Sequence, residues 1–553
     1  MSRIVLTLES PRRVHYYVAG DEAPDTSDPV SPRLLDPGEL RQAAAWLGGE
    51  AETGHVSCRL DNRDGALTTD FTDPPLRASL SEDGITRVAG TVQRITLGEE
   101  VSLTLVVGGA SSALIEDVPL RTTAVWERRE TVQALPLPFG RCTLTPIRYS
   151  ADGRFWLVAD GTIQRIEEVR KGADLYPPGR WALVNRTDDA GHAVALLEIQ
   201  DYPLEEGEAL SVTLDGLTHP SAGYLLENPA DVIWYLLDQV AGIATPAAQL
   251  AEFRAECAAA GLTVGLVVTG GSLRGVIGQV CDSVGALWSD ALPGVARLYP
   301  AALDSAPLWA SFTGTVGAGG LLDALAFSAD YARTEVFTRL QLDFDYDDAA
   351  NTFRQSVTVQ ADSLAREAFG ERATTVQARG VRSLRAAEDL AHRLLGYLAR
   401  PQWEVEFQAQ TSDRQPLAAL VPGVVVALDA PGCPLTGRQV LWAVRRGLAT
   451  GVVTLIVRGV TGRAPAITTV QRSSQLPDSR IEPVLYREGD TVIIVARDEQ
   501  GSVLPGALVS LNGQARQADA EGRAYFPGLA AGVYELQITA GEYELVDPNY
   551  EVL

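Results

Sequence analysis

The chain has 553 residues, a formal net charge of −25, and 46% hydrophobic, 21% charged and 7% aromatic residues. This length suits about three to five domains with large cores, and the composition is typical of a folded soluble protein. The acidic balance argues against a general nucleic-acid-binding surface, because phosphate contacts need clustered Lys and Arg, and the arginines here are scattered.

Lysine and cysteine usage sets further limits. Lys171 is the only lysine, a bias that a GC-rich bacterial or phage genome explains. The five cysteines form no Cys-x-x-Cys pair, so neither a zinc site nor a disulfide framework is supported. Cys257 and Cys281 fall on apolar helical stripes and are expected in the core.

The amino terminus has no apolar run long enough for a signal peptide. No run elsewhere approaches the roughly 18 apolar residues of a membrane span. We therefore expect a protein that is made in the cytoplasm and stays soluble. The many Gly and Pro residues and short alternating runs favour a mainly β fold with a helical insertion.

Residues 1–125 are expected to be β. Strand-like alternation at 86–96 and 101–107 predicts a hairpin across the Gly-Glu-Glu between them. Residues 36–49 are predicted to form a short helix or a loop insertion. Further predicted strands cover residues 4–8, 13–18, 55–60 and 76–80.

Residues 126–220 form a second β-rich segment. Phe155–Ala159 and residues 162–170 are predicted to pair as a hairpin across Asp160-Gly161. Later strands are expected at 193–200 and 209–214.

Residues 221–335 are expected to form a helical insertion. Asn228 can cap a first helix that has Pro229 in its first turn and ends at Gly242. A second helix is predicted between residues 245 and 261. Ser272 is predicted to begin a third.

Residues 336–460 combine strands with one clear helix. The apolar stripe of residues 383–400 predicts an amphipathic helix that Ser383 caps and Pro401 terminates. Strands are predicted at 338–347, 352–361, 403–410 and 424–428, followed by a hairpin of 440–446 with 452–460.

The carboxyl end divides into two parts. Residues 461–483 lack periodicity and are predicted to be a linker. Residues 484–553 have turns about every ten residues, which is typical of a small β-sandwich.

Several motifs resemble those of bacteriophage tail hub proteins, the baseplate or tail-tip hub family. They are Leu60-Asp-Asn-Arg-Asp-Gly65, Ala89-Gly-Thr-Val-Gln-Arg-Ile-Thr96, Glu227-Asn-Pro-Ala-Asp-Val-Ile-Trp-Tyr-Leu-Leu237 with the later Gly271-Ser-Leu-Arg-Gly-Val-Ile-Gly-Gln-Val280, and Val421-Pro-Gly-Val-Val-Val-Ala-Leu428. The resemblance implies two tube-like β-barrel domains, residues 1–125 and 336–460, with a β-rich hub domain at 126–220.

The same resemblance implies a homotrimer. Its two barrels per subunit would make a pseudo-sixfold ring that joins a sixfold tail tube to a threefold tip. DNA would pass through the ring at ejection without specific binding, and an acidic lumen would not retain phosphates. The implied partners are a distal tail or tail-tube protein, a tape-measure protein and central fibre or spike proteins, and the implied location is the virion tail tip.

Residues 484–553 resemble a carboxypeptidase regulatory-like β-sandwich. The resemblance rests on Pro505-Gly-Ala-Leu-Val509, Asp519-Ala-Glu-Gly-Arg-Ala-Tyr-Phe526 and Gly532-Val-Tyr-Glu-Leu536. It implies an alternative role, contact with a host-surface glycan, a receptor or a neighbouring tail protein. Asp498, Asn512 and Asp519 are predicted to form turns.

The acidic run Asp343, Asp345, Asp347 and Asp348 could suggest a calcium loop. An EF-hand loop needs Gly at its sixth position and Glu at its twelfth, and Asp348 and Arg354 stand there. We therefore predict the solvated face of a strand. The glycine-rich residues 314–320 lack a phosphate-binding pattern and are predicted to be a loop.

Catalytic patterns are missing from the sequence. The histidines form no metal-binding pair, no Gly-x-Ser-x-Gly occurs, and Glu167-Glu168 cannot be placed opposite each other. On the 383–400 helix, Glu388 with His392 and Asp389 with Arg393 are predicted surface ion pairs. We predict no catalytic, cofactor-binding or metal-binding residues and no enzyme; an exported enzyme with a sandwich appendage is the disfavoured alternative.

Overall fold

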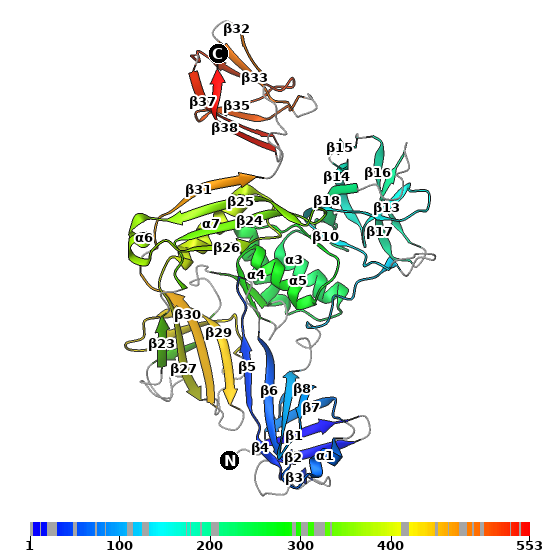
Figure 1. Cartoon of the computed structure of the whole chain (residues 1–553), viewed down its shortest axis with the longest axis vertical. Helices are drawn as coiled ribbons and strands as arrows, with labels where there is room; N and C mark the ends of the chain where they lie inside the picture. The colour runs from blue at the N-terminus through cyan, green and yellow to red at the C-terminus, as the bar shows by residue number, and fades with distance from the viewer. Residues whose placement is uncertain are drawn as a thin grey trace. The chain divides into compact units, whose positions relative to one another are not determined.

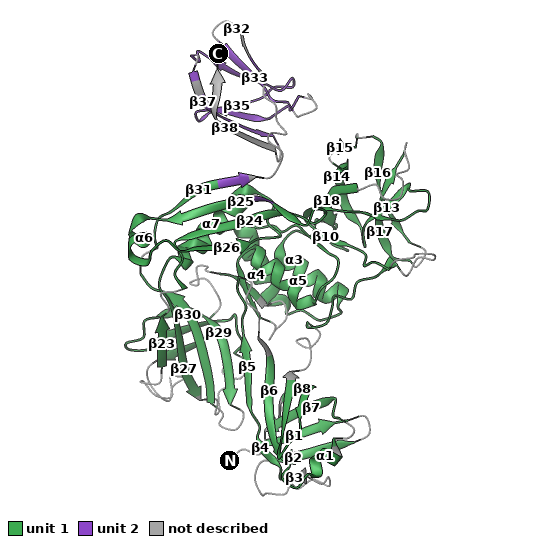
Figure 2. Cartoon of the chain, in the orientation of Figure 1, with its two compact units in different colours: residues 1–353, 357–471 green, residues 354–356, 472–553 purple. Residues whose placement is uncertain are grey.

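In the computed structural model the chain divides into two compact units, residues 1–353 with 357–471 and residues 354–356 with 472–553 (Figure 2). The fold is mainly β, as predicted, with 52% strand and 16% helix. The structure describes residues 4–10, 13–18, 30–47, 52–71, 74–82, 85–107, 114–123, 132–172, 174–176, 179–188, 191–200, 210–289, 295–299, 308–313, 327–331, 335–410, 420–447, 452–462, 464–474, 484–488, 491–497, 503–530, 532–540 and 543–552.

The largest feature of the first unit is a 15-stranded sheet in the order β23-β27-β30-β29-β5-β6-β9-β8-β7-β1-β2-β3, with β28 and β22 attached beside β29 and β4 beside β6 (Figure 1). Its strands are β1 (Ile4–Glu9), β2 (Val14–Val18), β3 (Val30–Ser31), β4 (Leu34–Asp36), β5 (Glu39–Ala43), β6 (Glu52–Asp61), β7 (Arg77–Glu82), β8 (Ile85–Thr96), β9 (Glu100–Val107), β22 (Leu308–Thr313), β23 (Phe327–Tyr331), β27 (Gln402–Gln410), β28 (Val425–Asp429), β29 (Gly437–Gly447) and β30 (Val452–Val460).

Two separate hydrophobic cores lie against this sheet. Strands β1 and β6–β9, with helix α1 (Ala66–Asp70), surround one core that includes Leu6, Leu60 and Leu103. Strands β22, β23 and β27–β30 surround another that includes Phe312 and Phe407. We call the two parts the first and the second β region. Strand β1 of the first β region buries alternate residues, whereas β29 of the second buries residues on both of its faces.

A second sheet of this unit has the order β26-β24-β25-β31 and packs against helix α7 (Figure 1). Ser383 caps α7 by accepting a bond from the N–H of Ala386, as predicted. The remaining elements here are β24 (Arg339–Asp347), β25 (Thr352–Ala361), α6 (Ser363–Phe369), β26 (Ala373–Gln377), α7 (Leu384–Leu398) and β31 (Ile467–Ser474).

The middle of the unit combines two four-stranded sheets with a helical layer around one core. Asn228 and Ser272 accept N–H bonds at the helix starts where the sequence predicts caps. The elements are β10 (Leu137–Phe139), β11 (Arg141–Leu144), β12 (Ile147–Arg148), β13 (Phe155–Ala159), β14 (Ile163–Lys171), β15 (Asp174–Leu175), β16 (Trp181–Thr187), β17 (Ala193–Ile199), β18 (Leu210–Leu217), α3 (Pro229–Trp234), the π-helical η2 (Tyr235–Val240), α4 (Ala247–Ala259), β19 (Leu266–Val268), α5 (Leu273–Ser283), β20 (Ala286–Ser289) and β21 (Val295–Leu298).

The second unit contains two sheets that share one core, including Val509, Phe526 and Leu536. This arrangement is that of a sandwich, while the carboxypeptidase regulatory-like assignment stays a prediction. The strands are β32 (Val484–Glu488), β33 (Thr491–Val495), β34 (Leu508–Leu511), β35 (Gln514–Gln517), β36 (Arg523–Pro527), β37 (Gly532–Ala540) and β38 (Tyr543–Val552).

Four sequence-based expectations need correction. Neither predicted barrel is closed along the strands that the structure describes, and the strands of 336–460 divide between two sheets. Residues 36–49 contain strand β5 instead of a helix or loop. Strands β13 and β14 belong to different sheets, so the predicted hairpin is wrong. The predicted linker contains β31, although residues 475–483 lie outside the described residues. The other domain boundaries stay predictions.

Candidate assembly surface

Strand β5 joins the two β regions into one sheet. Ala443 to Gly447 of β29 pair antiparallel with Ala43 to Glu39 of β5. On its other edge β5 pairs with β6, where Arg41 lies opposite His55. One five-residue strand therefore makes backbone contact with both regions.

Strands β29 and β6, which both pair with β5, are each paired along both of their edges in a similar way. One edge of β29 is covered by β30, and the other is shared between β28 along residues 437–440 and β5 along residues 443–447. Likewise β9 covers one edge of β6, and β4 and β5 share the other. The join is thus a repeated strand-sharing arrangement on both sides of β5.

A buried aromatic cluster lies where β5 ends. Trp46 makes edge-to-face contacts with Tyr299, Tyr397 and Trp442, with ring centroids 5.1, 5.3 and 6.3 Å apart. The hydroxyl of Tyr299 donates to that of Tyr397 over 2.8 Å. Burial raises the pKa of both phenols. Such contacts add about 0.5–1.5 kcal/mol per pair beyond burial, so the cluster holds β5 against β29 and α7.

Arg446 gives the join a buried polar connection. Its guanidinium donates to Gln42 Oε1 of β5 over 3.3 Å and to the carbonyl of Leu420. Burial lowers the pKa of Arg446 to about 10. A buried guanidinium is costly without acceptors, so these bonds specify how β5 lies against β29.

The solvent-facing side of the joined sheet carries paired charges. Arg445 and Arg41 lie opposite each other across the join, an arrangement in which like charges repel. Arg445 lies 3.4 Å from Glu406, and Arg41 lies 3.7 Å from Glu39, which offsets the repulsion. Similar pairs are Arg458 with Glu404 at 2.7 Å, and Arg59 with Asp36 at 3.2 Å and Glu100 at 3.4 Å.

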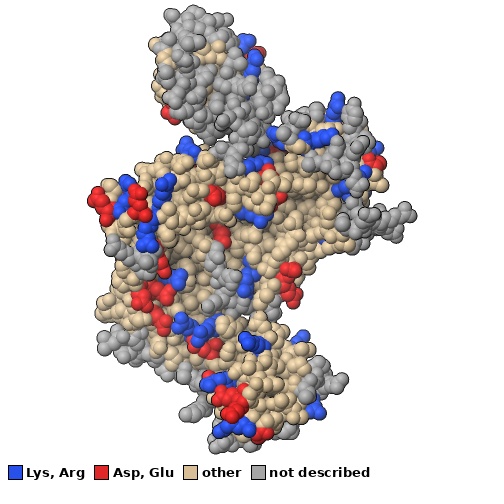
Figure 3. Space-filling model, in the orientation of Figure 1, with Lys and Arg blue, Asp and Glu red and all other residues tan. Residues whose placement is uncertain are grey.

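Figure 3 shows acidic and basic side chains close together on the visible face of the first unit. On this face Arg41, Arg445 and Arg458 each have a carboxylate within 4 Å, so their charges are locally balanced. The net charge of the whole chain therefore does not describe this face.

The acidic run of β24 is more buried than the sequence predicts. Asp348 accepts from Arg379 over 2.5 Å and lies 3.7 Å from Arg382, and Asp345 lies 3.6 Å from Arg382. Asp347 is 8% exposed and accepts the N–H groups of the following turn. The predicted solvated face is wrong for these three residues, because arginines from the segment after β26 pair with two of them.

On α7, Arg393 differs from its predicted surface pairing with Asp389, while the pairing of Glu388 with His392 stays a prediction. His392 Nε2 lies 3.0 Å from Thr469 Oγ1 of β31. Arg393 turns inward and donates to the carbonyl of Val284, and burial lowers its pKa. The polar positions of α7 thus connect neighbouring segments.

Other expectations have mixed outcomes. All five cysteines are buried and free. Asp519 accepts backbone N–H groups of its own turn, and Asn512 stands in the turn between β34 and β35, as predicted, with its side chain accepting the N–H of Glu535 on β37. Asp498 and residues 314–320 lie outside the described residues. Among the described residues, no three His, Cys, Asp or Glu side chains gather as a metal site. No described helix is long and apolar enough to cross a membrane.

Sequence reasoning missed Gln42, Trp46 and Arg446 altogether. Trp46 had one usable signal, an aromatic residue directly after three alanines. Gln42 and Arg446 had none, because their contact joins positions 404 residues apart.

No family model and no curated protein matches the chain. Among solved structures, a chain of the virion of a native gene transfer agent particle shares 17% identity over 60% of this chain and 86% of its own, with a TM-score of 0.37. A tail protein from Neisseria meningitidis MC58 shares 10% over 82% and 96%, with a TM-score of 0.32. The 43 kDa tail protein of prophage MuSo2 from Shewanella oneidensis shares 9% over 83% and 96%, with a TM-score of 0.35.

Proposed function

We propose that the chain is a structural protein of a phage tail, which forms a trimeric baseplate or tail-tip hub. The observation that carries the proposal is the join through β5. Because β5 pairs with β6 and β29, each copy presents two β regions in one continuous sheet. Three copies would then present six regions, as a ring between a sixfold tube and a threefold tip requires.

The paired charges on the exposed face fit a surface that DNA passes without being held. Phosphate binding needs arginines that are free of carboxylates, and Arg41, Arg445 and Arg458 each have one within 4 Å. A lumen formed by this face would carry paired charges of both signs and would not be uniformly acidic. The remaining implied partners, the tube, tape-measure and fibre or spike proteins, belong to the same proposal.

The oligomeric state tests the hub proposal. Mass measurement of the full chain across a concentration series is expected to reach three times 59.1 kDa. A tail particle imaged with the chain in place should show threefold symmetry at its level. A chain that stays monomeric in solution and in assembled particles would overturn the proposal.

The separate fold of the second compact unit favours an additional docking role for the carboxyl end of the chain. It has its own core and its own two sheets, so its removal need not disturb the first unit. We expect deletion of residues 484–553 to leave tail assembly intact and to reduce adsorption to the host. Loss of assembly on deletion would instead show that this unit is required to build the tail.

A further inference from the structure

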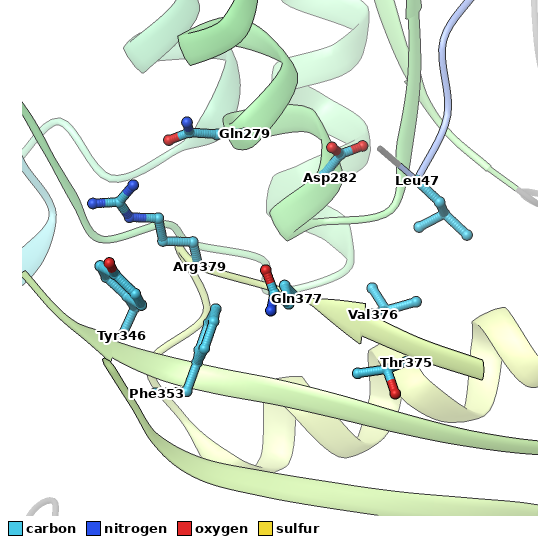
Figure 4. Close-up of a pocket in the computed structure, with 9 residues that line it drawn as sticks. All are labelled: Leu47, Gln279, Asp282, Tyr346, Phe353, Thr375, Val376, Gln377 and Arg379. Atoms are coloured by element: carbon cyan, nitrogen blue, oxygen red, sulfur yellow. The ribbon is translucent and has the colours of Figure 1, made fainter. Parts of the chain in front are cut away.

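A cleft of about 450 Å³ lies between helix α5 and the sheet that contains β24, β25 and β26 (Figure 4). Gln279 and Asp282 line it from α5, and Thr375 and Gln377 line it from β26. The volume lies within the range of about 300–1,000 Å³ that small-molecule sites have. The cleft is therefore large enough for one small ligand.

The two walls of the cleft are held at a fixed spacing. The hydroxyl of Ser283, at the end of α5, accepts the N–H of Gly380, which follows β26, over 2.8 Å. The same hydroxyl donates to the carbonyl of Gln279 over 2.7 Å. A Cβ at Gly380 would lie 2.9 Å from this hydroxyl, so the two segments approach more closely than a side chain would allow. A site whose walls are already in place loses little freedom when a ligand binds.

One part of the cleft carries two aromatic rings that are fixed by their own contacts. Tyr346 packs edge-to-face against Phe353 with ring centroids 4.9 Å apart, and its hydroxyl donates to Asn351. Arg379 stacks over the ring of Tyr346 at 4.1 Å and pairs with Asp348 at 2.5 Å. The two rings therefore offer a rigid apolar contact, and the charge of Arg379 is already balanced by Asp348.

Three polar side chains of the cleft have unused hydrogen-bonding groups. The amides of Gln279 and Gln377 and the hydroxyl of Thr375 make no hydrogen bond within the described part of the chain. Amides and hydroxyls both donate and accept. Because Gln279 belongs to α5 and Gln377 to β26, a ligand between the walls can bond to both of them.

The chemistry of the lining decides which class of ligand the cleft suits. A phosphate or other anion is disfavoured, because Asp282 repels it and Arg379, the one cation among the described lining residues, is already paired. A wholly apolar ligand would leave the amides of Gln279 and Gln377 without partners and away from water. A neutral sugar suits both parts of the lining, since its hydroxyls donate and accept as the amides do, and its C–H face can pack against an aromatic ring.

We propose that this cleft binds one neutral sugar unit, either a free monosaccharide or the terminal residue of a glycan. Gln279 and Gln377 bond to its hydroxyls from the two walls, Thr375 adds a third polar contact, and the Tyr346–Phe353 pair packs against the sugar ring. The site belongs to the first unit, so it is separate from the docking role proposed for the second unit. It does not depend on the hub proposal.

Saturation-transfer NMR tests the site with the full chain. The probes are the methyl glycosides of glucose, galactose, mannose and N-acetylglucosamine, each measured beside the free reducing sugar. At least one sugar is expected to bind with a Kd on the order of 1 mM, as its small size implies. Binding of a methyl glycoside supports the terminal residue of a glycan as the ligand, and binding of a free sugar alone supports a monosaccharide. No binding of any of these sugars would overturn the proposal.

Glutamine variants test the assigned contacts. Gln279→Leu and Gln377→Leu each remove an amide and keep a similar volume, so sugar binding should weaken by about tenfold with an unchanged melting temperature. Gln514→Leu is the matched control, because Gln514 is an exposed strand glutamine on β35 of the second unit, and it should bind the sugar like the parent chain. If Gln377→Leu does not fold, Gln377→Ala makes the same test. Folded variants at both Gln279 and Gln377 that bind like the parent chain would overturn the proposal.

Discussion

The first and second β regions flank the same strand but support it differently. Strand β29 is packed on both faces, because Leu441 and Val444 enter the core of the second β region while Val440 and Trp442 enter the core around α7. Strand β6 buries Val56, Cys58 and Leu60 on one face, and its other face carries the exposed Ser57 and Arg59. The second β region is therefore the firmer support for β5.

The pairing of β5 follows the same asymmetry. Its register with β29 is continuous over five residue pairs, whereas its register with β6 is interrupted by a bulge between Arg41 and Ala43. Trp46 contacts Trp442 of β29, and Gln42 accepts a hydrogen bond from Arg446 of β29. We expect the sheet to open first between β5 and β6, and the following variants test that order.

The largest effect is expected from Trp442→Ala. Trp442 is 9% exposed and contacts Trp46 and Tyr299, so its loss leaves a cavity and should lower the unfolding free energy by about 3–5 kcal/mol. Trp309→Ala is the control, because that side chain is 36% exposed. Urea denaturation measures both. Equal midpoints for the two variants would show that the aromatic cluster does not secure the join.

Gly38→Ala acts on the β6 side. Gly38 has a φ of +84°, and a Cβ there would lie 2.3 Å from the carbonyl oxygen of Ser57 on β6. Positive φ and the clash together should cost about 2–3 kcal/mol. Gly172→Ala has a φ of +62° with open space around it, so it should cost about 1 kcal/mol.

Amide hydrogen exchange shows which strand the Gly38→Ala change destabilises. Gly38→Ala is expected to speed exchange in β6 more than in β29, because the strain falls on the weaker support. Faster exchange confined to β29 would contradict the proposed order of opening.

A smaller effect is expected from Gln42→Ala. The change removes one acceptor of Arg446, whose guanidinium keeps the carbonyl of Leu420, so the cost should be about 1 kcal/mol. Gln341→Ala removes an exposed side-chain bond to Asp343 and should change stability by less than about 0.5 kcal/mol. If the Gln42→Ala and Gln341→Ala variants have equal denaturant midpoints, Gln42 does not stabilise the join.

Local signals predicted the helices well and the join badly. Helix α7 lies within two residues of its predicted bounds, because its cap, apolar stripe and following proline are all close in sequence. Strand β5 was missed because Glu39-Leu-Arg-Gln-Ala43 contains good helix formers, and pairing with β6 and β29 overrides that preference.

The same limit applies to the barrels and to the acidic run. Residues 336–460 contain the predicted strands, but alternation does not tell which sheet a strand joins. The burial of Asp345 and Asp348 depends on arginines that follow β26, a contact with no fixed spacing. Residue pattern therefore predicts the elements, while the candidate surface depends on long-range pairing.

The smallest expected effect is a loss of stability at alkaline pH. Burial raises the pKa of Tyr299 and Tyr397 above the ordinary value of 10. In the folded chain both phenols keep their protons at a pH where the unfolded chain has lost them. Their stabilisation is therefore complete below pH 10 and is lost as pH rises above 10 toward the raised values.

Tyr397→Phe removes one of the two phenols and leaves the Tyr299 hydroxyl an acceptor, the Arg458 carbonyl at 3.3 Å. The unfolding free energy should change by less than about 1 kcal/mol at pH 7 and should fall less steeply than in the parent chain above pH 10. Urea unfolding between pH 7 and 11 measures the slopes, and the values below pH 9 serve as the control. Because both phenols lie on the β29 side, raising the pH above 10 should increase amide exchange in β29 more than in β6, which is expected to exchange faster at neutral pH. An alkaline increase in exchange confined to β6 would show that these tyrosines do not stabilise the β29 side.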